Sequence, residues 1–345
     1  MTDDLPRNER SGSLSVIALL LIFFLSAVIS GGILIVTNVV RMTRSDSREA
    51  DLVLRADELS KTIVARFADD ETPESDGPSL FLKELALPEN GSVSIEDISS
   101  RINPNAIRKQ ILEETSLSPL LLEDASADRL QQIRFDAGPA IDIESRYESV
   151  LDIAGSPELF TAYGLFNVNT TDEFVLETLV EHRTHDASFA RDFRMDVQDA
   201  LARRRIIDAY TLSSFFGEHE EVLWPIITSA PIWNIHFAPE QILGAILAYE
   251  PFGISSVPSI VDEIVTLRRD TEIAPEELFQ LLGVEPTHRI SQFVGTQTWF
   301  WRVRIELSGL TANYTIFATP NEAPFSEKRS YLIIERVLEY NGTGA

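Results

Sequence analysis

Five carboxylates lie close together in the stretch DDETPESD, and they could do metal chemistry. They are Asp69, Asp70, Glu71, Glu74 and Asp76. Carboxylate oxygens are the ligands that Ca²⁺ prefers, and a loop that carries several of them can fold around the ion. A solvated acidic loop is the ordinary alternative for a run of like charges. The spacing leaves a calcium site in this stretch open, and no ligand set follows from it.

His182, His185 and Asp186 form the second group that could hold a metal. A spacing of three on a helix puts two imidazoles on one face, but no third ligand is evident and a surface pair is the simpler interpretation. The sequence has no GxSxG, HExxH or P-loop pattern. It also has no cysteine, which excludes disulfides and thiolate metal sites. We therefore predict no catalytic residue and no certain cofactor, with calcium left open.

A polar pair recurs three times ahead of an apolar helical pattern. GLFNVNTTDEFVLETLVEHR begins at Gly164 and PIWNIHFAPEQILGAILAYE begins at Pro231, and the interval between these two starts gives the period of the repeat. A fainter third unit begins at Ser100 with SRINPNAIRKQILEE. The pairs are Asn103 and Asn105, Asn167 and Asn169, and Asn234 and His236.

These pairs are expected to start helices and to tie the units together. A short polar side chain accepts the free backbone N–H groups at the first turn of a helix. Thr170 or Thr171 is expected to cap the helix that carries Phe174, and Pro239 to occupy the first turn of the next one. Side chains of these types more often make local bonds to the backbone than ligand sites.

The composition limits the class of partner. The chain has 345 residues, with 29 lysines and arginines against 54 aspartates and glutamates, and its formal net charge is −25. Nucleic-acid binding depends on neutralising phosphates with lysine and arginine, which this balance opposes. Hydrophobic residues make up 44% of the chain, enough for sizeable buried cores. We expect no nucleic-acid partner.

The elements that must position these groups begin with a segment free of charge. Residues 13–40 hold no charged side chain, and about 20 apolar residues suffice to cross a bilayer as a helix. Residues 1–12 are short and polar and are predicted to be a leader. A stripe of apolar residues at helical spacing continues the helix beyond the span. It consists of Leu52, Ala56, Leu59, Ile63 and Phe67.

The rest of the chain predicts an α+β fold. A strand is expected near GSVSIEDIS at 91–99, helical patterns dominate the middle, and aromatic and β-branched residues alternate in the C-terminal segment from 288 to 345. Strands on both sides of a helical block indicate that the block is inserted. We expect a small antiparallel sheet in an α/β domain of residues 41–100 and 288–345. The insertion, 101–287, is expected to be all-α and built of helix-hairpin-helix-like repeats.

FNVNTTDEFVLETL resembles the NxNTAxxxxLxAL signature of the minor pseudopilin K family of type II secretion (general secretion pathway protein K). RYESVLDIAGSPELF, at 146–160, resembles the segment that precedes the signature in that family. The anchor, the helical block and the C-terminal strands also follow the order of the family, so the resemblance covers nearly the whole chain. The NxNT element alone is shared with helix-hairpin-helix proteins.

The resemblance implies an assembly role in a bacterium. A prepilin peptidase would cut between Gly12 and Ser13, and the new N-terminus would be methylated. Most pilins have glutamate at the fifth mature position, where this chain has Ile17. The K family also lacks that glutamate, as suits a subunit with nothing above it. The chain would be a single-pass protein of the inner membrane with its soluble part in the periplasm.

The partners that the resemblance implies are other pseudopilins. Minor pseudopilins of the I and J type would form a tip complex with this chain, and the major pseudopilin would add from below. The apolar stripe would continue the packing between subunits outside the membrane. Two other classes remain as alternatives: a membrane-anchored helix-hairpin-helix protein for DNA binding or uptake, and an anchored enzyme.

Overall fold

The computed structural model describes residues 37, 42, 47, 49–69, 76, 91–122, 129–130, 132–134, 142–203, 205–318 and 330–340. The chain divides into two compact parts, Met1–Asp57 and Glu58–Ala345. In the first part, residues 49–57 are helical, as are the described residues before them. No helix among the described residues combines the length and hydropathy needed to cross a membrane. The expected span at 13–40 lies outside them, apart from Thr37.

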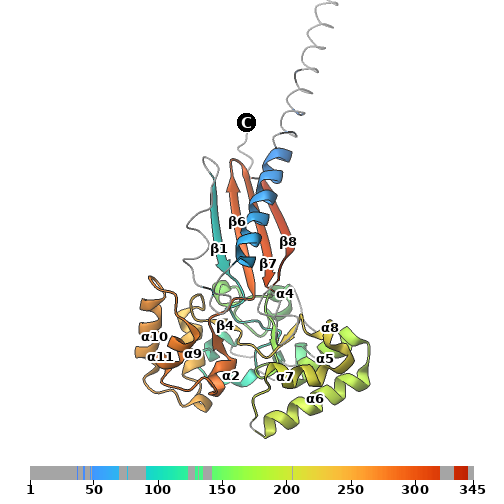
Figure 1. Cartoon of the computed structure of the whole chain (residues 1–345), viewed down its shortest axis with the longest axis vertical. Helices are drawn as coiled ribbons and strands as arrows, with labels where there is room; N and C mark the ends of the chain where they lie inside the picture. The colour runs from blue at the N-terminus through green and yellow to red at the C-terminus, as the bar shows by residue number, and fades with distance from the viewer. Residues whose placement is uncertain are drawn as a thin grey trace, which may run out of the picture. The chain divides into compact units, whose positions relative to one another are not determined.

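The second part contains a four-stranded antiparallel sheet in the order β1-β6-β7-β8 (Figure 1). This sheet confirms the α+β class and the small antiparallel sheet predicted from the alternation of β-branched and aromatic residues. Its strands are β1 (Ser92–Asp97), β6 (Phe300–Leu307), β7 (Leu310–Ala318) and β8 (Tyr331–Tyr340). Strand β1 pairs with β6 although the whole helical segment separates them in the chain.

One face of the sheet is apolar and packs against the helix of residues 58–68. On β6, Trp301, Val303 and Ile305 are buried, whereas Arg302 and Arg304 on the other face are at least partly exposed. The alternation follows from the two-residue period of a strand. The ring of Phe67, near the end of the helix, lies 5.4 Å from the ring of Trp301. This packing makes the sheet and residues 58–68 one layered structure.

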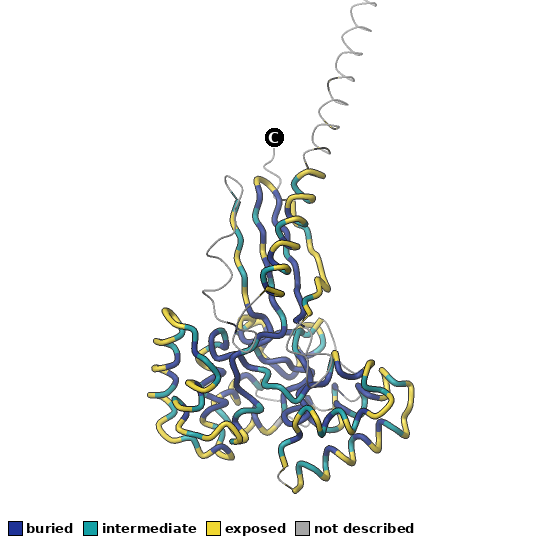
Figure 2. Tube along the Cα trace, in the orientation of Figure 1, coloured by how far each residue is buried: buried dark blue, intermediate teal, exposed yellow. Residues whose placement is uncertain are grey.

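Strand β8 lies at the edge of the sheet and is largely exposed, whereas β7 is mostly buried and β6 alternates between buried and less buried residues (Figure 2). Apolar side chains contribute to that exposure, and Ile333 and Ile334 are 40% and 48% exposed. On the inner face, Tyr331 places its ring 5.4 Å from that of Phe67. The strand therefore contributes to the core mainly at its beginning.

The helices lie in the chain between β1 and β6, and Figure 1 shows them gathered beyond one end of the strands. Backbone contacts fix that end, because the N–H of Ile98 donates to the carbonyl of Phe300 at 3.0 Å. The α-helices that lie wholly within the described residues are α2 (Lys109–Glu113), α4 (Ile143–Tyr147), α5 (Glu173–Thr184), α6 (Ala187–Ala202), α7 (Ala209–Phe216), α8 (Glu220–Leu223), α9 (Glu240–Leu247), α10 (Val257–Leu267) and α11 (Pro275–Leu282). Short 3-10 helices join them: η1 (Ser118–Leu120), η2 (Pro157–Leu159), η3 (Gly217–His219), η4 (Glu250–Phe252) and η5 (Arg289–Gln292).

The helical segment is not all-α, because short parallel pairings recur in it. Strand β2 (Phe166–Asn167) pairs with β3 (Ile227–Thr228), and β4 (Trp233–Asn234) pairs with β5 (Val294–Gly295). A parallel bridge joins Ile102 to Phe160 in the same way. The interval along the chain from β2 to β4 equals the interval from β3 to β5. Three repeated units are therefore present, and the third continues past residue 287, where we expected the segment to end.

Each repeated unit is closed by the chain that follows its helices. The second unit has its own buried core, in which the rings of Phe193 and Phe216 stack at 5.9 Å. The first and third units share a larger core, which includes Ile102, Leu112 and Ile242. Because each short strand or bridge pairs with the end of its own unit, the pairing brings the start and the end of every unit together.

Candidate functional site

The three polar pairs occupy the same local turn in the three units. The side-chain Oδ1 of Asn103 accepts from the N–H of Asn105 at 2.9 Å. The equivalent distances are 2.7 Å from Asn169 to Asn167 and 2.9 Å from His236 to Asn234. The carbonyl oxygen of each first member also accepts from the backbone three and four residues later. The pairs therefore turn the chain from each short strand or bridge into the first helical turn of its unit.

The second member of each pair bonds to the later part of the same unit. The hydroxyl of Tyr147 donates to Oδ1 of Asn105 at 2.8 Å. Asn169 exchanges two bonds with the backbone of Ile207, both at 2.9 Å. The N–H of Ile273 donates to Nε2 of His236 at 2.8 Å.

His236 accepts its bond as a neutral ring. Its pKa is lowered to about 4, first by burial and then by the nearby charge of Arg268. The guanidinium of Arg268 donates to the carbonyls of Ile235 and Ala238, at 2.9 and 2.8 Å. The ring that is neutral near pH 7 thus serves as the acceptor that the N–H of Ile273 needs.

Two of the expected helix caps differ from the prediction. The cap of α5 is Asp172, whose carboxylate accepts from the N–H of Phe174 at 3.0 Å. Thr170 and Thr171 lie before the cap, and their backbone N–H groups close the turn on the carbonyl of Asn167. Aspartate is as strong a capping residue as threonine or stronger, which explains the difference. Pro239 stands at the N-cap of α9, one residue before the position that we expected.

The first member of each later pair reaches out of its own unit. Nδ2 of Asn167 donates to the carbonyls of Ala230 and Gln292, at 2.6 and 3.0 Å. Nδ2 of Asn234 donates to the carbonyl of Asp76 at 3.0 Å and to Oγ1 of Thr298 at 2.9 Å. The pairs therefore tie units to one another and, through Asn234, tie the third unit to the beginning of β6.

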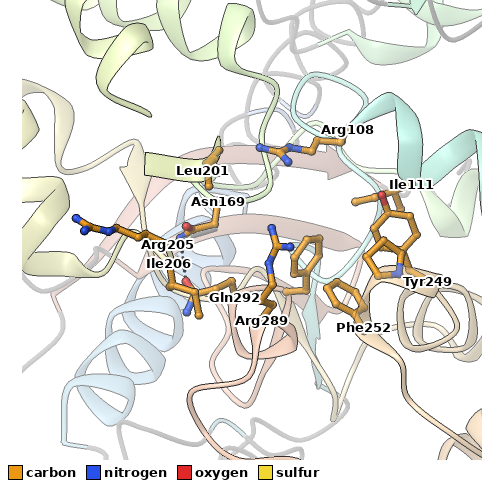
Figure 3. A pocket seen from close by; sticks show the side chains of 12 residues that line it. Arg108, Ile111, Asn169, Leu201, Arg205, Ile206, Tyr249, Phe252, Arg289 and Gln292 are labelled. Carbon is orange, nitrogen blue, oxygen red and sulfur yellow. Dashed lines mark hydrogen bonds between the residues drawn. The ribbon is translucent and has the colours of Figure 1, made fainter. Parts of the chain in front are cut away.

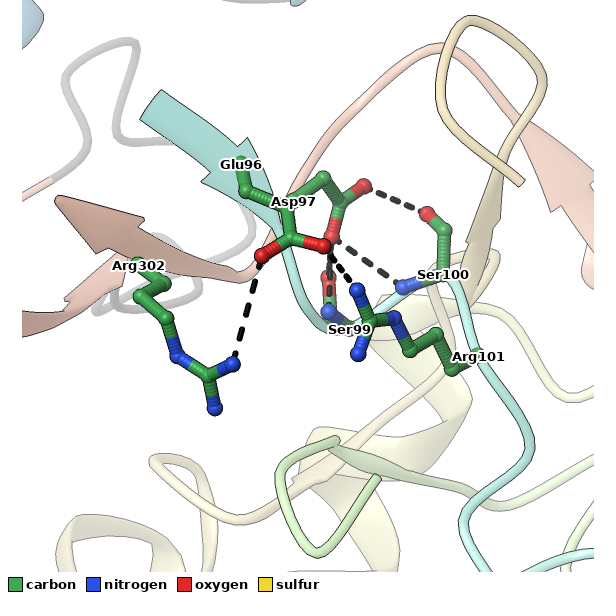
Figure 4. A network of polar contacts seen from close by, with 6 residues as sticks. All are labelled: Glu96, Asp97, Ser99, Ser100, Arg101 and Arg302. Atoms are coloured by element: carbon green, nitrogen blue, oxygen red, sulfur yellow. Dashed lines mark hydrogen bonds and ion pairs between the residues drawn. The ribbon is translucent and has the colours of Figure 1, made fainter. Parts of the chain in front are cut away.

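The polar junction is the cluster around Asp97 where β1 ends and β6 begins. Figure 4 shows Asp97 beside Ser99 and Ser100, which are all nearly fully buried. Its carboxylate accepts from the N–H and hydroxyl of Ser99, both at 2.7 Å, and from the N–H and hydroxyl of Ser100 at 3.1 and 2.5 Å. It also accepts from the hydroxyl of Thr298 at 2.9 Å.

The junction is continuous with the third unit. The hydroxyl oxygen of Ser100 accepts from the N–H of Asn234 at 2.8 Å. Thr298 donates its N–H to the carboxylate of Asp76 at 2.6 Å. Farther out, Glu96 forms ion pairs with Arg101 and Arg302 near the same strand end. The buried hydrogen bonds of this network link the end of β1 to the beginning of β6 and to the third unit, so its role is structural.

Because Asp97 is buried, the stability of the polar junction depends on pH. Burial raises the pKa of Asp97 from 3.8 to about 6, although its hydrogen bonds oppose the shift. A carboxyl group with a raised pKa stabilises the folded state most when protonated, so that its contribution declines as pH rises through about 6. We expect the free energy of unfolding contributed by this group to fall by about 1 kcal/mol between pH 5 and pH 7.5.

The measurement is urea unfolding of the wild type and of Asp97→Asn across pH 5–7.5, which avoids the sequence pI near 4.5. The amide cannot titrate, so the stability difference between wild type and variant should favour the wild type more at pH 5 than at pH 7.5. Equal pH slopes in the two proteins would show that this carboxylate does not titrate in that range.

The structure gives no metal site among the residues that it describes. No group of three or more His, Asp or Glu side chains there is placed to hold a metal ion. His182 and His185 are exposed at the end of α5. Of the acidic stretch, Asp69 is exposed and Asp76 is buried, and Asp70, Glu71 and Glu74 lie outside the described residues.

The structure describes the apolar stripe but not the predicted processing site. Ile63 and Phe67 are buried within this chain, each with 1% of its surface exposed. Ala56 is buried and Leu52 and Leu59 are half-buried. Phe67 packs against the sheet of its own chain. Packing of the stripe between subunits therefore stays a prediction. Three positions lie outside the described residues: Gly12, Ser13 and Ile17.

The sequence prediction missed the polar junction. Asp97 belongs to the alternating stretch at 91–99, for which the sequence predicts a strand, and the sequence predicts no role for Thr298. A local signal was available in the letters DISS, since an aspartate followed by serines two and three residues later is typical of a side-chain-to-backbone turn. The long-range bond to Thr298 left no such signal.

Comparison with known proteins gives a distant likeness. No family model matches this chain, and no curated protein matches it. Among solved structures, a chain in the crystal structure of the GspK–GspI–GspJ complex from the type 2 secretion system of enterotoxigenic Escherichia coli is similar to it. The match covers 86% of this chain and 99% of that chain, with 12% sequence identity and a TM-score of 0.39. Both values are low, so the likeness is a distant one.

Proposed function

We propose that this chain is a minor pseudopilin of the K family in a type II protein secretion system, where it caps the tip of the periplasmic pseudopilus and helps to initiate assembly. The support from the sequence is the signature-like stretch FNVNTTDEFVLETL together with the order of anchor, helical block and C-terminal strands. The support from the structure is that the repeated units lie beyond one end of the four-stranded sheet.

The observation that carries the proposal is the place where the units attach. Phe67 lies near the end of the helix of residues 58–68, and its ring contacts that of Trp301 near the start of β6. The ring of Trp301 in turn lies 5.3 Å from that of Phe237 in the third unit. The end of the helix therefore points toward the repeated units, and the units lie beyond that end. A bulky lobe in that place would block the addition of another subunit above.

The proposed mechanism is assembly rather than catalysis. The charge-free segment 13–40 would anchor the chain in the inner membrane, because a helix of that length and apolarity can span it. The I-type and J-type minor pseudopilins would pack beside the anchor, and the major pseudopilin would extend the filament from below. The distantly similar chain comes from a complex of GspK, GspI and GspJ. We propose no nucleic-acid partner, in keeping with the net charge of −25.

Replacement of Gly12 with leucine tests this function. A prepilin peptidase that requires a small residue before the cut would leave the leader in place. A chain that keeps this charged leader could not pack its anchor helix among those of the other subunits in the filament. We expect Gly12→Leu to retain residues 1–12, to lose secretion, and to disappear from pseudopilus tips. The measurements are N-terminal mass analysis of the membrane extract, an assay of secreted protein, and immunogold labelling of the tips.

The control is Ser11→Ala, which keeps the glycine and should be processed to a chain beginning at Ser13. Normal secretion by an unprocessed Gly12→Leu chain would refute the processing step. Immunogold label distributed along the whole pseudopilus, or absent from it in the wild type, would refute the capping role.

A further inference from the structure

A small cavity lies where the three repeated units meet (Figure 3). Its volume is about 150 Å³. The first unit contributes Arg108 and Ile111, and the second contributes Asn169 and the segment after α6. The third contributes aromatic side chains and the 3-10 helix η5. The cavity is therefore made by the assembly of the units and belongs to none of them alone.

Arginines are concentrated around this cavity in a chain that is strongly acidic. Arg108, Arg205 and Arg289 line it, one from each unit, while the chain as a whole carries a net charge of −25. Figure 3 shows the side chains of Arg108 and Arg289 directed toward the same space, whereas Arg205 extends away at the rim. Two guanidinium groups that face the same space are a common arrangement for binding a carboxylate or a phosphate.

The charge of Arg108 is only partly compensated inside the protein. Its guanidinium reaches the carbonyl of Thr171 at the long distances of 3.4 and 3.5 Å. Burial lowers its pKa, and the charge of Arg289 lowers it further. Asp172 and Glu173 act in the opposite direction. The carboxylates of both already accept bonds elsewhere, from the N–H of Phe174 and from the amide of Gln198.

Arg289 is available for a ligand. It is exposed on η5, and no ion pair joins it to another described residue. An anion between the two arginines would relieve the repulsion that each imposes on the other. Arginine also loses little conformational freedom per bond when its planar fork meets a carboxylate.

Aromatic rings form one wall of the cavity. The ring of Phe252 lies 4.7 Å from that of Phe293 and 5.4 Å from that of Tyr249, in edge-to-face arrangements. Two amides complete the opposite side, and Nδ2 of Asn169 donates to Oε1 of Gln292 at 2.9 Å. The cavity thus offers positive charge at one side and an apolar surface at the other.

We propose that this cavity binds a small carboxylate with an apolar body, held by Arg108 and Arg289 with the body against Phe252 and Tyr249. The volume sets the size of the ligand, because sites for drug-sized molecules measure roughly 300–1,000 Å³. A monocarboxylate about as large as an aromatic side chain fits this size, and a nucleotide does not. The apolar wall favours a carboxylate with such a body over inorganic phosphate. This site goes beyond the proposed assembly function and does not depend on it.

The test is calorimetric titration of the full chain, purified with a neutral detergent, with phenylacetate. Benzyl alcohol supplies the apolar body without the charge, acetate supplies the charge without the body, and inorganic phosphate supplies a different anion. We expect phenylacetate to bind at least tenfold more tightly than each of the other three. Arg289→Gln should weaken phenylacetate binding at least tenfold, since it removes a charge-assisted bond.

Arg289 is chosen because it is exposed, so that its replacement should not disturb folding, which circular dichroism verifies. The matched control is Arg269→Gln, an exposed arginine after α10 that does not line the cavity, and it should bind as the wild type does. Undetectable phenylacetate binding, or equal binding by Arg289→Gln and wild type, would overturn the proposal. Phosphate binding as tight as that of phenylacetate would overturn the assignment of the apolar body.

Discussion

Replacing Asn234 with alanine is expected to lower the free energy of unfolding of residues 58–345 by about 3–5 kcal/mol, because each buried partner left unsatisfied costs roughly 1–3 kcal/mol. Asn234 is fully buried. Its Nδ2 donates to the carbonyl of Asp76 and to Oγ1 of Thr298, and its Oδ1 accepts from the backbone N–H of His236. The Nδ1 of His236 also bonds to the same Oδ1, at 3.0 Å. Alanine removes all four bonds and offers nothing to replace them, in a place that water does not reach.

The measurement is urea unfolding followed by circular dichroism, with Asn313→Ala as the control. Asn313 is half-buried on the polar face of β7, where water can replace its contacts. The control should therefore change the free energy of unfolding by less than about 0.5 kcal/mol, as is usual for surface substitutions. If both variants lose stability equally, the bonds of Asn234 do not join the third unit to the sheet.

Replacing Trp301 with alanine is expected to cost about 3–5 kcal/mol, the usual range for a large aromatic residue removed from a core. Trp301 is 1% exposed. Its ring lies 5.4 Å from that of Phe67 on the helix and 5.3 Å from that of Phe237 in the third unit. A single side chain thus contacts the helix, the sheet and the repeated units, and the cavity left by alanine would loosen all three.

Unfolding in urea again measures the effect, with far-UV circular dichroism as the signal because the substitution removes a tryptophan. Leu332→Ala on β8 is the control, since Leu332 is 53% exposed and should cost well under about 1 kcal/mol. Trp301→Phe should retain much of the stability, because it keeps an aromatic ring in the same site. A Trp301→Ala chain as stable as the Leu332→Ala chain would show that this ring is not the centre of the core.

The strands were predictable where side chains alternate. Val93 and Ile95 mark β1, and Trp301, Val303 and Ile305 mark β6, because one face of the sheet is buried and the other is polar. The two-residue strands of the repeated units were not predictable. A stretch such as Trp233–Asn234 is too short to show any period, and its pairing partner lies far along the chain, beyond the helices of the third unit.

The polar pairs were predictable because their spacing recurs, and the structure places all three in one kind of turn. The identity of the cap at Asp172 was not, since Thr170, Thr171 and Asp172 are all capping residues and only the backbone conformation selects among them. The bond between Asp97 and Thr298 joins residues that are 201 positions apart. Nothing in the local sequence of either residue indicates the other, so only the folded chain reveals the polar junction.

The antiparallel pairing of β1 with β6 gives the repeated units the position of a loop. Neighbouring antiparallel strands can be joined by a hairpin loop of two residues. Here the connection between two neighbouring strands instead carries all three repeated units, whose short parallel pairings lie outside the four-stranded sheet. The sheet therefore closes the start of the first unit against the end of the third, and the units fold as one continuous insertion between two paired strands.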